Sequence, residues 1–377
     1  MRKSYEEIVR ETMQLLEENE EWITRYQDYL VKLQPEGRPY KAIQLLDKKF
    51  QPEFPLVKYN TIHDVKRIKE VVKFDIRFWG CSIGVITVKI GKKPLEELDV
   101  DDVCNKATIK FDINALQSTK KFIAEDNSLK QLYEELVNQI AAEEGKHYNW
   151  RQSEECKRYR VLVKRLKEEK ALLLENEHAV ETTLLYELAK TSGINKGIKG
   201  IQPHRICGKN FYQLKTVLGA SEAKTGKIKY SGRSGGGIDI LAKKNYGFRS
   251  ELCVIELKDN YLRSERPTKA VSQGICYATF LIQLIRKANT ENLNWYKDIF
   301  EMNEPLDKPI TVNVVVAMPY PEGISSWEEL SEEDRKLSEH EPISVGGDFI
   351  KLHTLFFDGV KYDADGEISM CNMCSSL

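Results

Sequence analysis

The chain has 377 residues, which is more than one hydrophobic core usually supports, so we expect two domains. Hydrophobic residues make up 41% and charged residues 31%, a balance that excludes a disordered, collagen-like or rod-like chain. The formal net charge of −1 excludes a global attraction to nucleic acid or to an anionic membrane, so positive charge that binds a polyanion must be local.

The sequence predicts a cytoplasmic protein without a membrane segment. Its first residues, MRKSYEEIVRETMQLLEENEEW, contain acidic residues throughout and lack the apolar segment of a signal peptide. No apolar run reaches the length of about 18 residues that spans a bilayer. The eight cysteines are scattered, several of them inside apolar runs, which is typical of reduced thiols in a cytosol.

The first part of the chain predicts helices followed by strands. Residues 4–33 have an irregular apolar face and predict a helix, whereas the prolines within 34–58 predict an extended connection. The β-branched and aromatic residues of 71–90 predict a hairpin, and ATIKFDI (107–113) predicts a further strand. A helix is expected over 118–143.

A highly charged segment, residues 151–177, follows these elements. One stripe of it is apolar and the rest is solvated, so we expect a long helix that connects two domains. We place the boundary near residue 165. Residues 1–165 then form an α+β domain of unknown role that ends in this helix, and residues 166–377 form the second domain.

The second domain has the element order of a mixed α/β fold. We expect, in chain order, a helix at 176–191, strands at about 201–217, 237–243 and 251–258, a helix at 267–288, and strands at 310–318 and 349–357. A meander of three strands before a crossover helix predicts a mixed central sheet flanked by helices.

Three charged residues stand inside the apolar strands of this meander. In ELCVIELKD (251–259) side chains alternate between faces, so Glu256 and Lys258 share one face, roughly 7 Å apart. In GGGIDIL, Asp239 points away from its two isoleucine neighbours. If the two strands pair as an antiparallel hairpin, Asp239 lies close to Glu256 across the ladder.

Such a cluster predicts a metal-dependent hydrolytic site. Two carboxylates repel each other when both are ionised, and a hard divalent cation removes that conflict. Mg²⁺ prefers a few carboxylate oxygens, keeps several waters, polarises a phosphoryl oxygen and lowers the pKa of its water. A lysine beside the ion can hold the attacking water or balance the charge of a phosphate. We therefore expect Mg²⁺ as the cofactor, with Mn²⁺ as a substitute.

The sequence G-I-D-I, followed by a hairpin and E-L-K, resembles the motif of the PD-(D/E)XK nuclease superfamily. Ile238 stands where the motif is named for proline, a departure that this superfamily tolerates. Gln273 and Tyr277, at i and i+4 in SQGICYATF, resemble the Q-x-x-x-Y element of its RecB-like branch. The resemblance covers about residues 175–320 and implies a restriction-endonuclease-like fold with an αβββαβ core.

The resemblance also implies a set of metal ligands. These are Asp239, Glu256, the carbonyl of Leu257 and an acidic residue on the helix upstream. Glu181 is our choice on that helix, because it precedes three leucines at helical spacing. Two further glutamates of the same helix remain alternatives, namely Glu177 and Glu187.

The remaining residues that the resemblance implies act on the substrate. Lys258 would orient the attacking water. Gln273 and Tyr277 would lie beside the site and help to position the substrate.

Two other motifs have weaker interpretations. SGRSGGG (231–237) lacks the spacing of a nucleotide-binding loop and precedes a strand, so a mobile approach for nucleic acid and an ordinary flexible hairpin both remain open. CNMC (371–374) has the spacing of metal ligands but no second ligand pair, so we interpret it as part of a frayed tail.

Basic residues gather around the proposed motifs and supply the local positive charge that the net charge does not. They are Lys224, Lys227, Lys229, Arg233, Lys243, Lys244, Arg249, Arg263, Arg266 and Lys269. We therefore expect a metal-dependent nuclease that acts on DNA in preference to RNA, as an endo- or exonuclease. By analogy such an enzyme fits prokaryotic defence or DNA repair, and a homodimer fits the cutting of two strands. The alternatives are a non-catalytic nucleic-acid-binding or scaffolding module on the same fold, and a hydrolase of small nucleotides.

Overall fold

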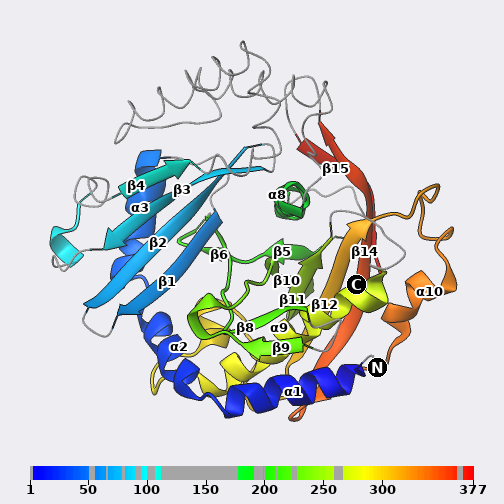
Figure 1. Cartoon of the computed structure of the whole chain (residues 1–377), viewed down its shortest axis with the longest axis horizontal. Coiled ribbons are helices and arrows are strands. Elements are labelled where there is room, and N and C mark those ends of the chain that lie inside the picture. The colour runs from blue at the N-terminus through cyan, green and yellow to red at the C-terminus, as the bar shows by residue number, and fades with distance from the viewer. Residues whose placement is uncertain are drawn as a thin grey trace.

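A computed structural model of the chain describes thirteen parts of it (Figure 1). The described residues are 3–50, 56–64, 67–78, 81–90, 95–99, 107–111, 177–190, 198, 200–208, 210–222, 227–258, 266–362 and 368–377. The helix expected over 118–143 and the charged connecting helix before residue 177 lie outside them.

The described elements of the first part are three helices and a run of strands. They are α1 (Tyr5–Glu17), α2 (Glu21–Lys32), α3 (Arg38–Phe50), β1 (Leu56–Asp64), β2 (Arg67–Phe78), β3 (Cys81–Ile90), η1 (Leu95–Glu97) and β4 (Ala107–Phe111).

The later elements include one long, buried helix, α9. They are α8 (Glu177–Ala189), β5 (Ile201–Pro203), β6 (Arg205–Ile206), β7 (Asn210–Tyr212), β8 (Leu218–Glu222), β9 (Lys227–Tyr230), η5 (Gly232–Ser234), β10 (Ile240–Tyr246), β11 (Arg249–Leu257), α9 (Pro267–Lys287), η6 (Trp295–Ile299), β12 (Thr311–Pro319), α10 (Glu332–Arg335), η7 (Lys336–Glu339), β13 (Ile343–Val345), β14 (Asp348–Tyr362) and β15 (Ile368–Ser375).

A mixed sheet of seven strands forms the centre of the second part. Its order is β13-β14-β12-β11-β10-β5, and β15 also pairs with β14. The β5–β10 and β10–β11 pairs are antiparallel, whereas β11–β12 and β12–β14 are parallel. The long helix α9 provides the crossover from β11 to β12, as a parallel pair requires. The expected mixed α/β sheet with flanking helices is therefore present.

Different helices cover the two faces of this sheet, and successive side chains of a strand point to opposite faces. Leu252 and Val254 of β11 belong to the hydrophobic cluster that includes α9. Cys253 and Ile255 belong to a second cluster, to which α8 contributes Leu184. The alternation predicted from the sequence therefore sets which side chains of β11 face α9, and Glu256 is one of them.

The N-terminal helices share a hydrophobic cluster with α9. The rings of Trp22 and Tyr26 on α2 lie 5.6 and 5.3 Å from the ring of Phe280 on α9. The hydroxyl of Tyr5 donates to the carbonyl of Thr268 at 3.2 Å. The expected domain boundary near residue 165 lies outside the described residues, but the chain on its two sides contributes to one core.

A second sheet joins the same two parts of the chain. Its six strands have the order β4-β3-β2-β1-β7-β6 (Figure 1). The β2–β3 hairpin and β4 occupy the places predicted for strands. β1 pairs in parallel with β7, with Leu56 opposite Phe211, so a strand of the first part lies beside a strand of the second.

Some elements differ from their predictions. The helix expected over 4–33 is two helices, α1 and α2, and α3 lies within the segment predicted to be extended. Pro39 misled that prediction, because it occupies the first turn of α3, where proline is tolerated. The strand expected over 201–217 is broken into β5, β6 and β7, with Cys207 and Gly208 at positive φ between them.

The C-terminal prediction also needs correction. β14 extends beyond the expected strand to Tyr362, and β15 returns along it with Phe356 opposite Cys374. The CNMC sequence is therefore part of a strand, and its interpretation as a frayed tail is wrong. Among the described helices, none combines the length and apolarity that a membrane crossing needs.

Candidate metal centre at the end of the hairpin

The hairpin of β10 and β11 brings the three predicted charged residues to one end of the sheet. Ile240 lies opposite Ile255, so Asp239, just before β10, lies beside the end of β11. Glu177, the first residue of α8, reaches the same place. One carboxylate oxygen each from Glu177, Asp239 and Glu256 lies within 4.8 Å of the others, and we call these three residues the acidic cluster.

The acidic cluster is buried on one side and open on the other. Glu256 is fully buried, Asp239 is partly buried, and the side chain of Glu177 is 52% exposed. A ligand can therefore approach from the Glu177 side and meet a carboxylate that is held inside the protein.

Hydrogen bonds fix the positions of these groups. The amide of Leu257 donates to Oδ2 of Asp239 at 3.0 Å, which ties the acid to the neighbouring strand. The ammonium of Lys258 donates to Oε1 of Glu256 at 2.8 Å and to the carbonyl of Leu257 at 2.7 Å. Its Nζ lies 3.7 Å from Oε1 of Glu177. Asp239, Glu256, the Leu257 carbonyl and Lys258 are thus brought together.

Burial and mutual repulsion disfavour the ionised acids. Burial raises the pKa of Glu256 from its ordinary 4.5 to about 7, although the charge of Lys258 opposes the shift. Burial, followed by the charge of Glu256, also raises the pKa of Asp239 well above its ordinary value. For Lys258, burial lowers the pKa, but the attraction and hydrogen bond of Glu256 outweigh it, so the pKa is raised overall.

The acidic cluster fits a hard divalent cation. Oε2 of Glu256 is buried and has no hydrogen-bond partner among the described residues, although a buried carboxylate oxygen normally has one. The available donors are carboxylate oxygens and one backbone carbonyl, the ligands that Mg²⁺ prefers. A cation would satisfy the orphaned oxygen and offset the burial and the repulsion that raise both pKa values.

The helix α8 contributes a different glutamate from the one chosen by sequence spacing. Glu177, one of the two alternatives, is the member of the acidic cluster. Glu181 lies one turn further along and is only 4% exposed, and its charge contributes to the raised pKa of Asp239. Glu187, near the other end of α8, forms an ion pair with Lys190 at 2.6 Å.

The predicted pair on α9 lies close to the acidic cluster. Burial raises the pKa of Tyr277, and the charges of Glu256 and Asp239 add to that shift, whereas a hydrogen bond with Gln273 opposes it. The helix itself approaches closely, because a Cβ on Gly274 would stand 2.5 Å from Cγ1 of Val314 and 3.7 Å from Cβ of Glu256. Gly274 therefore allows α9 to pack over Glu256.

The glycines before Asp239 are required by close packing. A Cβ on Gly235 would stand 2.1 Å from the carbonyl oxygen of Thr216, and one on Gly236 would stand 2.0 Å from Oη of Tyr277. The amide of Gly236 also donates to the carbonyl of Leu218 at 2.7 Å. These glycines therefore seat the chain against Tyr277, which neither interpretation of a flexible loop anticipated.

Sequence reasoning missed two polar residues beside these glycines, Gln213 and Lys215. The alternation of polar residues within an apolar run, which pointed to Glu256 and Lys258, would also have identified these two residues. Both stand at alternate positions in an apolar run, NFYQLKTVL (210–218), which places them on one face of an extended segment.

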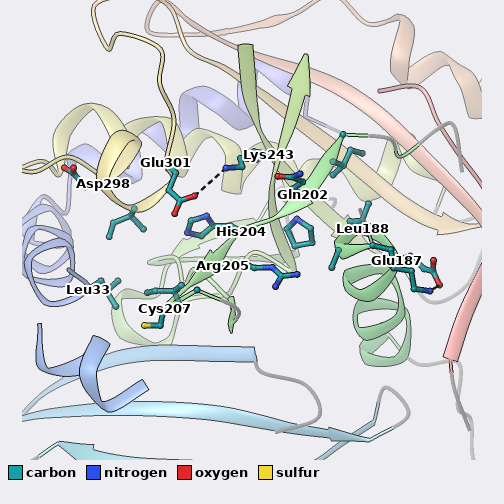
Figure 2. A pocket seen from close by; sticks show the side chains of 18 of the residues that line it. Leu33, Glu187, Leu188, Gln202, His204, Arg205, Cys207, Lys243, Asp298 and Glu301 are labelled. Carbon is teal, nitrogen blue, oxygen red and sulfur yellow. Dashed lines mark hydrogen bonds and ion pairs between the residues drawn. The ribbon is translucent and has the colours of Figure 1, made fainter. Parts of the chain in front are cut away.

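A cavity of about 820 Å³ lies elsewhere, between the C-terminal end of α8, β5 and β6, and residues 298–301 (Figure 2). Its ionisable groups balance: Lys243 lies 3.6 Å from Glu301, and burial lowers the pKa of His204 to about 3, which keeps that ring neutral. No residue of the acidic cluster lines this cavity. Its charges favour no class of ligand, so the acidic cluster is the better candidate site.

Comparison with known protein families, with curated proteins and with solved structures found no match for this chain.

Proposed function

We propose that this protein is a Mg²⁺-dependent nuclease that hydrolyses phosphodiester bonds, with DNA preferred to RNA as substrate. The elements around the seven-stranded sheet support the proposal, because α8, β5, β10, β11, α9 and β12 follow one another in the αβββαβ order that the nuclease resemblance implies, with β6 to β9 of the other sheets inserted between β5 and β10. The three strands form an antiparallel meander, and β12 joins it in parallel after the crossover helix.

The observation that carries the proposal is the acidic cluster with a lysine inside it. A surface salt bridge usually consists of one acidic and one basic side chain, both exposed to solvent. Here a fully buried glutamate lies beside two more acids; within the described parts of the chain one of its oxygens has no hydrogen-bond partner, and one ammonium, that of Lys258, contacts the group. Two buried carboxyl groups with raised pKa values beside a specific charge partner, such as Asp239 and Glu256 beside Lys258, are a typical sign of a functional site.

The residues have distinct roles in this proposal. Glu177, Asp239, Glu256 and the carbonyl of Leu257 would hold the ion. A bound Mg²⁺ supplies Lewis-acid polarisation of a phosphoryl oxygen and a lowered pKa for a coordinated water.

Lys258 acts as a donor at the open side of the cluster. Its ammonium is anchored by Glu256 and the Leu257 carbonyl, and a third N–H can hold the attacking water or a phosphate oxygen. Its charge also balances the negative charge that a phosphate brings to three acids. Gln273 and Tyr277 complete the wall from α9 and position the substrate against Gly236.

Cleavage assays on plasmid DNA and on single- and double-stranded oligonucleotides, of DNA and of RNA, test the proposal. Lys258→Ala is compared with Lys308→Ala, an exposed lysine that precedes β12 at the opposite end of the sheet. We expect cleavage by the wild type in Mg²⁺ or Mn²⁺, none in a chelator, and a loss of at least about 100-fold in Lys258→Ala.

The control variant should cleave like the wild type. Absence of metal-dependent cleavage of every substrate by folded wild-type protein would refute the nuclease. Retained binding of nucleic acid in that case would indicate the non-catalytic module, and cleavage of small nucleotides alone would indicate the nucleotide hydrolase.

A further inference from the structure

A short extended segment that ends at β8 lies directly beside the glycines that precede Asp239. Lys215 and Gly237 form an antiparallel bridge. The amide of Thr216 donates to the carbonyl of Gly236 at 2.8 Å, and the amide of Ile238 donates to the carbonyl of Leu214 at 3.0 Å. Gly237 lies two residues, or about 7 Å of extended chain, before Asp239, and Lys215 lies opposite Gly237.

The side chain of Lys215 lies across this glycine. Its Nζ is 3.2 Å from the position that a Cβ on Gly237 would occupy, and Cδ of Gln213 is equally close. The absence of a side chain at Gly237 therefore leaves room for both Lys215 and Gln213 on the approach to Asp239.

Gln213 has a polar atom that the protein leaves unsatisfied. The residue is only 9% exposed, and its Oε1 has no hydrogen-bond partner among the described residues. A buried acceptor without a partner is unfavourable, so such an atom indicates that a ligand group completes the site. Its position against Gly237 places that group next to Lys215.

The backbone of Lys215 is held by the N-terminal helices. The hydroxyl of Tyr26, on α2, donates to the carbonyl of Lys215. Tyr26 is 2% exposed and packs against Phe280 and Trp295, so its hydroxyl has a fixed position. This bond fixes the backbone from which the Lys215 side chain extends across Gly237.

We propose that Lys215 binds a backbone phosphate of the nucleic acid next to the phosphate that is hydrolysed, and that Gln213 accepts a hydrogen bond from the same nucleotide. This inference rests on the proposed nuclease function and adds a positioning residue to it. Among the described residues, Lys258 is the one ammonium that contacts the acidic cluster, so an adjacent phosphate needs a second cation. Lysine binds phosphate as a point charge, which suits a contact without base preference.

The test measures binding and cleavage separately. Binding of a fluorescein-labelled DNA oligonucleotide is measured in Ca²⁺ at several salt concentrations for the wild type, Lys215→Gln and Lys308→Gln. We expect Lys215→Gln to weaken binding about 3- to 10-fold and to reduce the slope of log K against log salt by about 0.7–0.9, as the loss of one phosphate contact requires. Its KM should rise while kcat stays within about twofold, and Lys308→Gln should match the wild type.

Two further variants separate charge from structure. Lys215→Arg keeps the charge and should keep the wild-type salt slope. Gly237→Ala displaces Lys215 and Gln213 without removing either, and should weaken binding while the melting temperature changes little. If Lys215→Gln does not fold, these two variants decide the question.

An unchanged salt slope and KM in Lys215→Gln, with cleavage lost in Lys258→Ala, would overturn this inference and leave the nuclease standing. Loss of binding in Lys215→Arg equal to that in Lys215→Gln would also overturn it. Failure of the wild type to bind and cleave any nucleic acid would instead remove the proposed function itself.

Discussion

The substitution Glu256→Gln should make the metal-free protein more stable at alkaline pH. Burial raises the pKa of Glu256 from 4.5 to about 7. Each pKa unit corresponds to 1.36 kcal/mol, so ionising this residue in the folded protein costs about 3 kcal/mol relative to the unfolded chain. Between pH 4.5 and about 7 Glu256 holds more protons in the folded state than in the unfolded state, so its contribution to stability falls as pH rises through this window and is constant above it.

The glutamine variant lacks that ionisation. In a chelator we expect the two proteins to have similar free energies of unfolding near pH 4.5, and the variant to be more stable by about 3 kcal/mol at pH 8. Urea denaturation at both pH values measures the difference. The exposed Glu322→Gln serves as the control and should follow the wild type.

Magnesium should remove most of this difference. A cation at 100 times its Kd stabilises the folded state by about 2.7 kcal/mol, and the variant, which lacks one carboxylate, should gain less. If Glu256→Gln has the pH dependence of the wild type in a chelator, Glu256 does not ionise as the geometry of the acidic cluster requires, and the argument for a metal centre fails.

Two further substitutions test the packing around the site. Gly236→Ala should destabilise the fold by about 1–3 kcal/mol, because its Cβ would collide with Oη of Tyr277, and the double variant with Tyr277→Phe should recover part of the loss in the same denaturation assay. Full stability in Gly236→Ala would contradict this packing. Trp22→Ala should lower stability by about 3–5 kcal/mol in one cooperative transition, because Trp22 packs on Phe280; a calorimetric profile with two transitions, of which one is unchanged, would instead favour separate domains.

The site could be predicted largely from strand alternation. In β11 a two-residue period fixes which side chains face α9, so Glu256 and Lys258 had to be neighbours once the strand was recognised. The antiparallel turn between β10 and β11 then fixed the place of Asp239. These placements involve residues of one strand or of one hairpin, so they can be predicted from the sequence alone.

The choice among the glutamates of α8 depends on long-range placement. Glu177 and Glu181 are separated by one helical turn and share a face, so periodicity cannot rank them. Which of them meets Asp239 is decided by where α8 begins relative to the end of β11, and that distance is set by sheet packing. Lys215 and Gln213 escaped notice for the same reason, since their relation to Asp239 is a contact between separate segments.

The helix α3 and the strand β15 illustrate two limits of local signals. The prolines of residues 34–58 predict extended chain, but Pro39 stands in the first turn of α3, where its missing amide has no cost. Polar and cysteine residues near the C-terminus suggested no element, yet β14 offers an edge that β15 can pair with. In both places tertiary packing, and not the local sequence, determines the secondary structure.

The shared hydrophobic cluster of α2 and α9 has a consequence for biosynthesis. Trp22 and Tyr26 leave the ribosome about 260 residues before Phe280, a delay of roughly 13–50 s at ordinary rates of translation. During that interval their aromatic rings lack the surface that later covers them. Newly made chains therefore pass through a stage in which α1 and α2 expose apolar surface. Synthesis that stops before α9 should leave a product that binds chaperones or aggregates.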